Sequence, residues 1–273
     1  MIETAFAKIN LALHVRERQA DGYHRIETLF AFAEDGDRLT LEDGGSVLTV
    51  VGPFGTALVG GGDNLVTRAA DAFRARFGGG PAAFTLDKRL PVAAGIGGGS
   101  ADAAAALRLL ARRGGVAADD PALMAIAAAL GADVPACLLS RPVRGDGRGD
   151  ALRTIDAGDL RGLPLLLVNP NVPLSTGPVF AGWDGADRGA LADGPPLAVA
   201  AAGRNDLEPP ARAIRPEIGA VLAALDGQAG ARLVRMSGSG ATCFALFDTI
   251  AARDRAAAAM PGAWWTLATR LRP

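Results

Sequence analysis

Ten residues between a predicted strand and a predicted helix set the first condition on the fold of this 273-residue chain. Positions 91–100 read PVAAGIGGGS. They follow the strand-like AAFTLDKRL and precede ADAAAALRLLARRGG, a run of strong helix formers that ends at Gly114 and Gly115. Ordering consecutive glycines costs conformational entropy on folding, so we expect a structural or binding role that requires them. Either the backbone packs closely there, or it closely approaches a ligand.

If the backbone approaches a ligand, the residues of this turn predict a phosphate site. Glycines let backbone N–H groups come close to a ligand, and the start of the next helix directs unpaired N–H groups and the positive end of its dipole toward the turn. A packed turn without a ligand is the alternative. The predicted nucleotide-binding residues are Pro91, Val92, Ala93, Ala94, Gly95, Ile96, Gly97, Gly98, Gly99, Ser100 and Ala101.

Two familiar nucleotide motifs do not fit this turn. The dinucleotide fingerprint GxGxxG matches at Gly95 and Gly97 but has Ser100 in place of its last glycine, and the stretch about 20 residues later offers no good acidic candidate. The Walker motif fails because no lysine follows the glycines. A nucleotide-binding oxidoreductase stays a remote alternative, and it would predict a doubly wound parallel sheet.

Composition excludes several classes of partner. Hydrophobic residues make up 49% and charged residues 21%, which is ordinary for a soluble globular protein. The net charge of -1 predicts no binding to nucleic acid or to an anionic membrane. No apolar run approaches the ~20 residues that span a bilayer, and no export signal is apparent. Cys137 and Cys243 form no disulfide or metal pattern, so a cytoplasmic location is expected.

The N-terminal stretch AFAKINLALHV, residues 5–15, reads as a strand. Its odd positions are all apolar, so one face packs on a core while Lys8 and Asn10 project together from the other. Of 28 basic residues only Lys8 and Lys88 are lysines, in a chain that otherwise uses arginine. Lys8 is therefore a candidate to stabilise charge on a reacting oxygen. The alternative is an edge-strand lysine that reaches water.

Further patterns predict the organisation of the chain. We expect a strand at 25–33, a hairpin pairing 37–42 with 46–52, and a helix after residue 64, capped by Asp63 or Asn64. Helices are also expected around a break at Gly131. Beyond residue 164 the order is strand, helix, strand, strand, helix, strand, which is typical of a ferredoxin-like α+β layer. A Gly/Pro/Ala-rich connection covers about residues 182–204.

Two aspartates lie near predicted helix starts, and we interpret them differently. Asp133, in GADVP, could accept or orient a hydroxyl proton, and it is also a good candidate to cap the helix that follows; the two interpretations can coexist. Asp102 is assigned to stabilising its helix through the dipole. No cluster of His, Cys and Asp indicates a dedicated metal site.

A turn and a second glycine loop offer candidate binding residues. Tyr23 and His24 lie in a turn, where an aromatic face can stack on a base and an imidazole can bind the base's edge; packing of Tyr23 on the core is the alternative. His14 lies on the same strand face as Lys8. It could contact the substrate or have a peripheral role, and the sequence favours neither. The loop 237–240 either lines a pocket or is a tight hairpin turn.

PVAAGIGGGSA resembles the ATP-binding loop of the galactokinase, homoserine kinase, mevalonate kinase and phosphomevalonate kinase (GHMP) superfamily. Nearly the whole chain resembles one family within it, the 4-diphosphocytidyl-2-C-methyl-D-erythritol kinases. The motifs AKINLALHV, ADGYH, TLF, DNLVTRAA, GADVPACL, NDLEP and MSGSGATCFALF occur in that family's order. The resemblance implies a two-domain α+β fold. The N-terminal domain would be ribosomal-protein-S5-like and bind ATP over residues 1–158, and a ferredoxin-like domain over 159–273 would close the acceptor site across a cleft.

The resemblance also implies roles for single residues. It places the catalytic pair at Lys8 and Asp133, with Asn10 beside the lysine at the substrate. It assigns the substrate's cytosine to Tyr23, His24 and Phe180. The chain departs from the family at Leu174-Ser175-Thr176-Gly177, where a proline is expected before the threonine, and this weakens the case for Phe180.

The activity implied is ATP-dependent phosphorylation of the 2-hydroxyl of CDP-methylerythritol in the non-mevalonate route to isoprenoids, with Mg²⁺ arriving on the nucleotide. Another small-molecule kinase of the superfamily, for homoserine or mevalonate, is the main alternative. Neither of those acceptors has a base to stack on the ADGYH turn. A nucleotide sensor without turnover is a third possibility, against which Lys8 and Asp133 both count.

Overall fold

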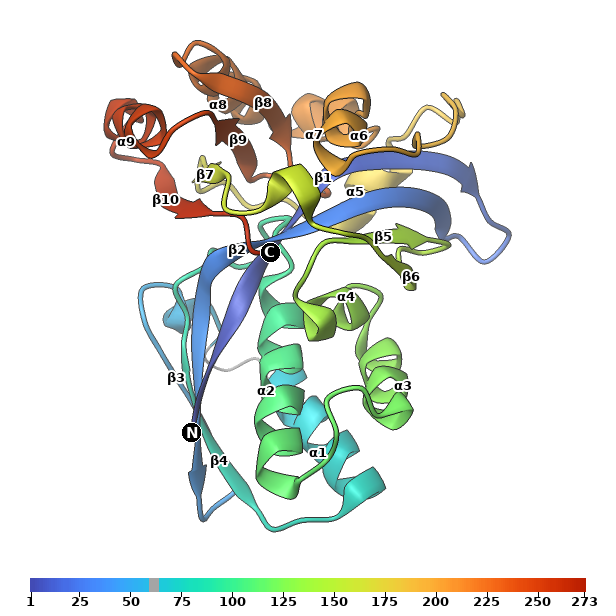
Figure 1. Cartoon of the computed structure of the whole chain (residues 1–273), viewed down its shortest axis with the longest axis vertical. Coiled ribbons are helices and arrows are strands. Elements are labelled where there is room, and N and C mark those ends of the chain that lie inside the picture. Colours follow the sequence, from blue (N-terminus) through green and yellow to red (C-terminus); the bar gives the residue numbers. More distant parts are fainter. Residues whose placement is uncertain (59–63) are drawn as a thin grey trace. The chain divides into compact units, whose positions relative to one another are not determined.

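The computed structural model describes residues 1–58 and 64–273 (Figure 1). The predicted cap Asp63 therefore lies outside the described residues. The chain forms two compact units. The first consists of Met1–Ala7, Asp35–Val92 and Gly97–Ser140, and the second of Lys8–Glu34, Ala93–Ile96 and Arg141–Pro273. Strands β1 (Ile2–Arg18) and β2 (His24–Asp43) contribute residues to both units. Among the described helices, none is long and apolar enough to cross a membrane.

The first unit combines short strands with four helices that pack on one another (Figure 1). Asn64 caps its first helix, because the side-chain oxygen accepts a hydrogen bond from the Val66 N–H at 2.9 Å. The elements are β3 (Leu48–Val51), a 3-10 turn (Gly55–Leu58), α1 (Leu65–Phe77), β4 (Ala82–Asp87), α2 (Gly98–Gly114), α3 (Pro121–Leu130) and α4 (Val134–Leu139).

The predicted hairpin between 37–42 and 46–52 is wrong. β4 lies between the two segments, antiparallel to β2 and parallel to β3. The reason is burial: Phe84 and Leu86 of β4 are buried, whereas β3 alternates between half-buried and exposed residues. The more apolar strand takes the inner place. β2 also continues unbroken past Gly36, where a Cβ atom would lie 1.9 Å from the carbonyl oxygen of Ala5.

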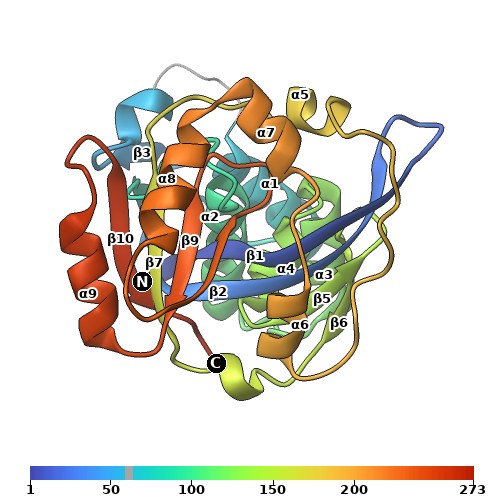
Figure 2. The ribbon, with the colours of Figure 1, turned by 90° about the horizontal axis from the view of Figure 1, so that it is seen from above.

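The second unit contains the predicted ferredoxin-like layer. Its sheet has the strand order β10-β7-β9-β8 with every pair antiparallel, and α8 and α9 pack on these strands (Figure 2). The elements are β5 (Val143–Asp146), β6 (Ala151–Thr154), a 3-10 turn (Gly158–Leu160), β7 (Pro164–Asn169), α5 (Thr176–Ala181), α6 (Pro196–Ala202), α7 (Glu208–Ile214), α8 (Glu217–Asp226), β8 (Ala231–Met236), β9 (Cys243–Phe247), α9 (Ile250–Ala259) and β10 (Trp265–Arg270).

The sequence did not predict several elements of the second unit. The β5–β6 hairpin was not predicted, and α6 lies inside the expected connection 182–204. The single helix expected after residue 206 is two helices, α7 and α8. They separate at Arg215, because a residue before proline is disfavoured in helical geometry and Arg215 adopts φ -132° and ψ 86°.

Candidate active site

The glycine turn leads directly into α2. The helix begins at Gly98, three residues before the predicted start at Ala101. Gly97 stands at its N-cap position with φ 63°, a left-handed conformation that favours glycine. A glycine has no side chain with which to cap the helix, so the first N–H groups of α2 are left for another acceptor. This geometry suits an anion such as phosphate.

Close packing explains another glycine of the turn. A Cβ atom on Gly95 would lie 2.5 Å from the carbonyl oxygen of Ser237, in the second glycine loop. The Ser237 hydroxyl donates to the Gly95 carbonyl at 2.9 Å and accepts from the Asn10 N–H at 3.2 Å. Ser239 is paired with Thr176 at 2.9 Å between their hydroxyl oxygens. The loop 237–240 thus supports the 93–96 part of the glycine turn, beyond being a simple hairpin turn.

Lys8 is buried within the second unit, with 3% of its surface exposed. Its Nζ donates to Asn10 Oδ1 at 2.9 Å and lies 5.0 Å from the centre of the Phe30 ring. Asn10 is held in turn, because its Nδ2 donates to the Thr28 hydroxyl at 2.8 Å. The edge-strand alternative for Lys8 is therefore wrong. The expected pairing of Lys8 with Asn10 on one strand face is confirmed, although both faces of β1 are buried here.

Asp133 belongs to the first unit, where it stands at the N-cap position of α4. In the described chain its side chain makes no capping hydrogen bond to that helix. Asp120 behaves differently: its Oδ1 accepts from the Ala122 N–H at 2.8 Å and caps α3. The capping interpretation of Asp133 is therefore wrong.

The aromatic turn residues lie in the second unit. Tyr23 is 55% exposed, so packing on the core is excluded, and the Arg148 guanidinium lies 4.4 Å from the centre of its ring. His24 is buried against Phe180, with ring centres 5.1 Å apart, and against Trp183 at 5.7 Å. Burial, together with the charge of Arg18, lowers the pKa of His24. The structure thus brings His24 and Phe180 together despite the departure at 174–177.

His14 is bound within the fold on both ring nitrogens. Nε2 accepts from the Arg204 N–H at 3.2 Å, so Nδ1 carries the proton and donates to the Gly189 carbonyl at 3.1 Å. Burial lowers the pKa of His14, and the nearby charge of Arg204 lowers it further. His14 therefore serves as a neutral structural residue in this arrangement.

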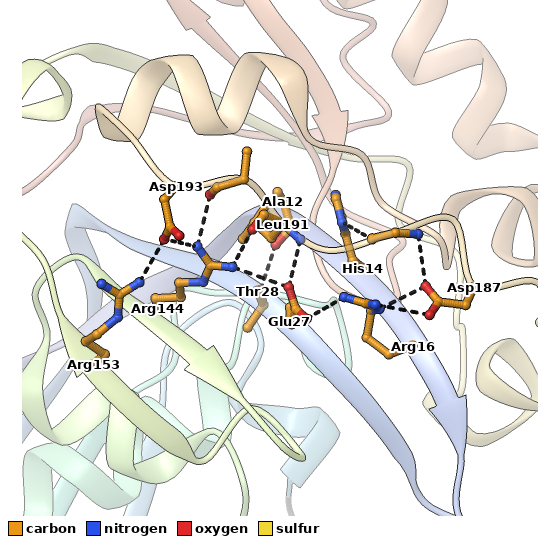
Figure 3. Close-up of polar contacts among 12 residues, drawn as sticks. Ala12, His14, Arg16, Glu27, Thr28, Arg144, Arg153, Asp187, Leu191 and Asp193 are labelled. Carbon is orange, nitrogen blue, oxygen red and sulfur yellow. Dashed lines mark hydrogen bonds and ion pairs between the residues drawn. The ribbon is translucent and has the colours of Figure 1, made fainter.

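A chain of ion pairs holds the segment after α5 against β1 and β2 (Figure 3). Arg16 binds both Glu27 and Asp187. Glu27 accepts from the Leu191 N–H at 2.7 Å, and Arg144 reaches Glu27 and Asp193. His14 lies at one end of this chain in Figure 3, and Thr28, the partner of Asn10, is drawn beside it with its own hydrogen bond to the Ala12 carbonyl. Much of the predicted connection is thereby fixed beside β2 and β1, and β1 is the strand that carries Lys8.

Lowering the pH should destabilise the protein through His14. Its pKa is lower in the folded than in the unfolded state, so the unfolded chain binds the proton more readily. The stability that depends on the neutral ring is present above about pH 6.5 and is lost as the pH falls below that value. We expect His14→Gln to reduce the drop in melting temperature between about pH 7.5 and about pH 5.5. An unchanged drop in the variant would show that other groups cause it.

The prediction for Asp102 needs correction. Asp102 is the fifth residue of α2, beyond the first turn, and its carboxylate binds the buried Lys88 ammonium at 2.8 Å. Asp37 binds the same ammonium. The sequence patterns gave no sign of this three-residue cluster, because its members lie on three separate elements. The one hint was that Lys88 is one of only two lysines.

The chain matches a known kinase superfamily in both sequence and fold. The N-terminal domain model of the GHMP kinases matches residues 64–141, and their C-terminal model matches residues 191–265. A solved homoserine kinase from Cytophaga hutchinsonii shares the fold, with a TM-score of 0.67 at 19% identity over 96% of this chain and 95% of that one. Fold and glycine turn together define a GHMP kinase, which uses ATP.

More similar relatives narrow the assignment. A 4-diphosphocytidyl-2-C-methyl-D-erythritol kinase from Rhizorhabdus wittichii is 63% identical over 99% of this chain and 94% of its own length. One from Novosphingobium aromaticivorans is 56% identical over 99% and 92%. A crystal structure of 4-(cytidine 5'-diphospho)-2C-methyl-D-erythritol kinase matches with a TM-score of 0.83 at 35% identity, covering both chains fully. The chain belongs to the 4-diphosphocytidyl-2-C-methyl-D-erythritol kinase family. The predicted family and its α+β two-domain fold are confirmed.

Proposed function

We propose that the chain transfers the γ-phosphate of ATP to the 2-hydroxyl of 4-diphosphocytidyl-2-C-methyl-D-erythritol, a step of the non-mevalonate route to isoprenoids. The observation that carries the proposal is the end-to-end similarity to kinases of that name, three of which are 63%, 56% and 50% identical. The buried ammonium of Lys8 adds support, since a structural lysine has little reason to be desolvated on a strand face.

Lys8 and Asp133 are the proposed catalytic residues. Phosphoryl transfer needs mainly positioning and charge stabilisation. An ammonium fixed by Asn10 would stabilise negative charge on the attacking oxygen without having to reorganise. The Asp133 carboxylate would orient the hydroxyl and accept its proton late in the transfer.

The nucleotide would bind at the glycine turn. The uncapped N–H groups at the start of α2 suit its phosphates. Mg²⁺ would arrive with the nucleotide and be held chiefly by phosphate oxygens and water. Among the described residues, no three His, Cys, Asp or Glu side chains gather as a metal site.

Tyr23, His24 and Phe180 are proposed to hold the cytosine. One face of the Tyr23 ring lies under the Arg148 guanidinium, and the exposed remainder of the ring can stack on a base. His24 is covered by aromatic rings, which favours the neutral imidazole as a hydrogen-bonding group for the base edge.

Removing the Tyr23 ring should weaken binding of the acceptor. Stacking on an aromatic side chain is worth about 1–3 kcal/mol per base, so we expect Tyr23→Ala to raise the KM for the cytidine substrate about 10-fold or more. The KM for ATP should stay within about 2-fold of wild type. Tyr23→Phe keeps the stacking face and serves as the matched control. Equal effects of the two variants would contradict a stacking role.

A coupled assay of ADP release separates the related activities. The protein should release ADP with 4-diphosphocytidyl-2-C-methyl-D-erythritol and not with homoserine or mevalonate. A higher kcat/KM with either of the other two would overturn the proposed acceptor. A single-turnover experiment distinguishes a kinase from a nucleotide sensor. The oxidoreductase alternative is wrong, because the sheets are mostly antiparallel rather than doubly wound and parallel.

A further inference from the structure

A buried charge cluster of Lys88, Asp37 and Asp102 lies within the first unit. Lys88 Nζ is 2.5 Å from Asp37 Oδ2 and 2.8 Å from Asp102 Oδ2. The three side chains are 2%, 0% and 4% exposed. Lys88 directly follows β4, Asp37 lies in β2 and Asp102 lies in α2, so the cluster ties three parts of the unit together. We call it the lysine triad.

The triad holds the entrance of the glycine turn. Asp37 uses its second oxygen, Oδ1, to accept the backbone N–H groups of Arg89 at 2.6 Å and Leu90 at 2.8 Å. These two residues directly precede Pro91, where the turn begins. Asp37 therefore fixes the backbone just before the glycines, and its three hydrogen bonds satisfy both of its carboxylate oxygens.

The triad also lies directly beneath the start of α2. A Cβ atom on Gly98, the first residue of that helix, would be 3.0 Å from Lys88 Nζ and 3.8 Å from Asp37 Oδ2. The ammonium thus occupies the space that a side chain at Gly98 would need. Asp102, one turn further along α2, binds the same ammonium and fixes the exit of the turn.

Stability alone does not account for this arrangement. Two carboxylates share one ammonium away from water, and buried ion pairs are seldom more stabilising than apolar packing. Burial raises the pKa of Asp102 to about 7 against the opposing charge of Lys88. Asp102 Oδ1 is buried without a hydrogen-bond partner among residues 1–58 and 64–273. An unsatisfied buried oxygen costs free energy, so a further role is indicated.

We propose that Lys88, Asp37 and Asp102 are positioning residues for ATP, which clamp both ends of the glycine turn so that the first N–H groups of α2 face the phosphates. The inference rests on the proposed phosphate site at that turn. None of the three residues touches the nucleotide in this account. They act by preorganising the backbone, which otherwise would carry the conformational freedom of four glycines.

Asp102→Ala is the sharpest test, because it releases the exit of the turn and leaves Lys88 and Asp37 as a balanced ion pair. We expect the KM for ATP and the Kd for ATP, measured by calorimetry without acceptor, to rise at least about 10-fold. The KM for the cytidine substrate should stay within about 2-fold. Asp102→Asn keeps an oxygen acceptor for Lys88 and should restore the KM for ATP to within about 3-fold of wild type.

Arg108→Met provides the matched control. Arg108 lies on the same helix, away from the glycine turn, and joins it to Glu3 at 2.9 Å and to the Cys137 carbonyl at 2.7 Å. Its loss should lower the melting temperature and leave the KM for ATP unchanged. If Asp102→Ala behaves in the same way, with only its melting temperature altered, the positioning role is overturned.

The calorimetric Kd separates this inference from the proposed function. Weaker ATP binding by Asp102→Ala supports the clamp even if the acceptor proves to be a different alcohol. An unchanged Kd overturns the clamp while leaving the kinase activity standing. Should Asp102→Ala fail to fold, the comparison of Asp102→Asn with Asp102→Ser decides. Asn should bind ATP about as wild type does, and Ser, which is too short to reach Lys88, should bind it at least about 10-fold more weakly.

Discussion

Lys8→Met lowers kcat by about 10³-fold or more and leaves the KM for ATP within about 3-fold of wild type. This is one of the two largest effects we expect from a single substitution. Methionine is similar in length and apolar, so the variant removes the ammonium while filling its space. The positive charge of Lys8 stabilises most strongly the negative charge that develops on the attacking oxygen, so removing it should lower kcat. Steady-state kinetics with varied ATP measures both constants.

Thr28→Val is the control for Lys8→Met. Thr28 accepts the hydrogen bond from Asn10 Nδ2, and Asn10 in turn accepts from Lys8 Nζ. Valine keeps the shape of threonine and breaks this support without touching the ammonium. We expect a lower melting temperature and a loss of kcat below about 10-fold. If Thr28→Val and Lys8→Met lower kcat equally, placement of the strand and not the charge of Lys8 explains the effect.

Asp133→Asn is expected to lower kcat by about 10²- to 10⁴-fold. Asparagine keeps the shape and can still orient a hydroxyl, but it cannot accept the proton. A loss in this range therefore assigns proton acceptance to the carboxylate, whereas a loss below about 10-fold assigns orientation alone. Near-full activity of the variant would remove Asp133 from the mechanism.

A neighbouring aspartate provides the control for stability. Asp120→Ala removes a true N-cap, so it should cost about 1 kcal/mol of stability and leave kcat unchanged. Asp133→Ala removes no helix cap, since the Asp133 side chain does not cap α4, and it should lower kcat about as much as Asp133→Asn does. Chemical unfolding and kinetics on the two alanine variants compare the two aspartates. An equal loss of kcat in Asp120→Ala would show that the effect does not depend on the carboxylate of Asp133.

Local patterns predicted much of the fold because their causes are local. Alternating apolar residues gave β1, and Asn64 marks the start of α1 because an amide cap needs only the next few N–H groups. The glycines at 114 and 115 end α2 because Gly115 adopts the left-handed conformation. The second-half order of strands and helices could also be predicted, since β7 and β9 are continuous buried runs.

Features that depend on distant segments were not predictable. β3 sits beside β4 and not β2 because burial of Phe84 and Leu86 decides which strand is central. The β5–β6 hairpin is short and rich in arginine and glycine, so no strand pattern marks it. His14 looked ambiguous on its strand, because its partners at Gly189 and Arg204 are more than 170 residues away in sequence.

In the candidate site, too, local features could be predicted and features formed by distant segments could not. The glycine turn was evident from its residue types, whereas the roles of Lys8, Asp133 and Tyr23 depended on the family resemblance. The lysine triad was missed, because residues 37, 88 and 102 share no pattern until β2, β4 and α2 bring them together. Arg148 was missed for a similar reason: only the β5–β6 turn places it over the Tyr23 ring.

The proposed transfer can be followed with γ-³²P-labelled ATP and 4-diphosphocytidyl-2-C-methyl-D-erythritol, and the product's phosphate can be located by phosphorus and proton NMR. We expect one labelled product that carries the phosphate on the 2-hydroxyl, and we expect Lys8→Met to lose it. Label on a different oxygen, or release of label only as inorganic phosphate, would contradict the proposed transfer.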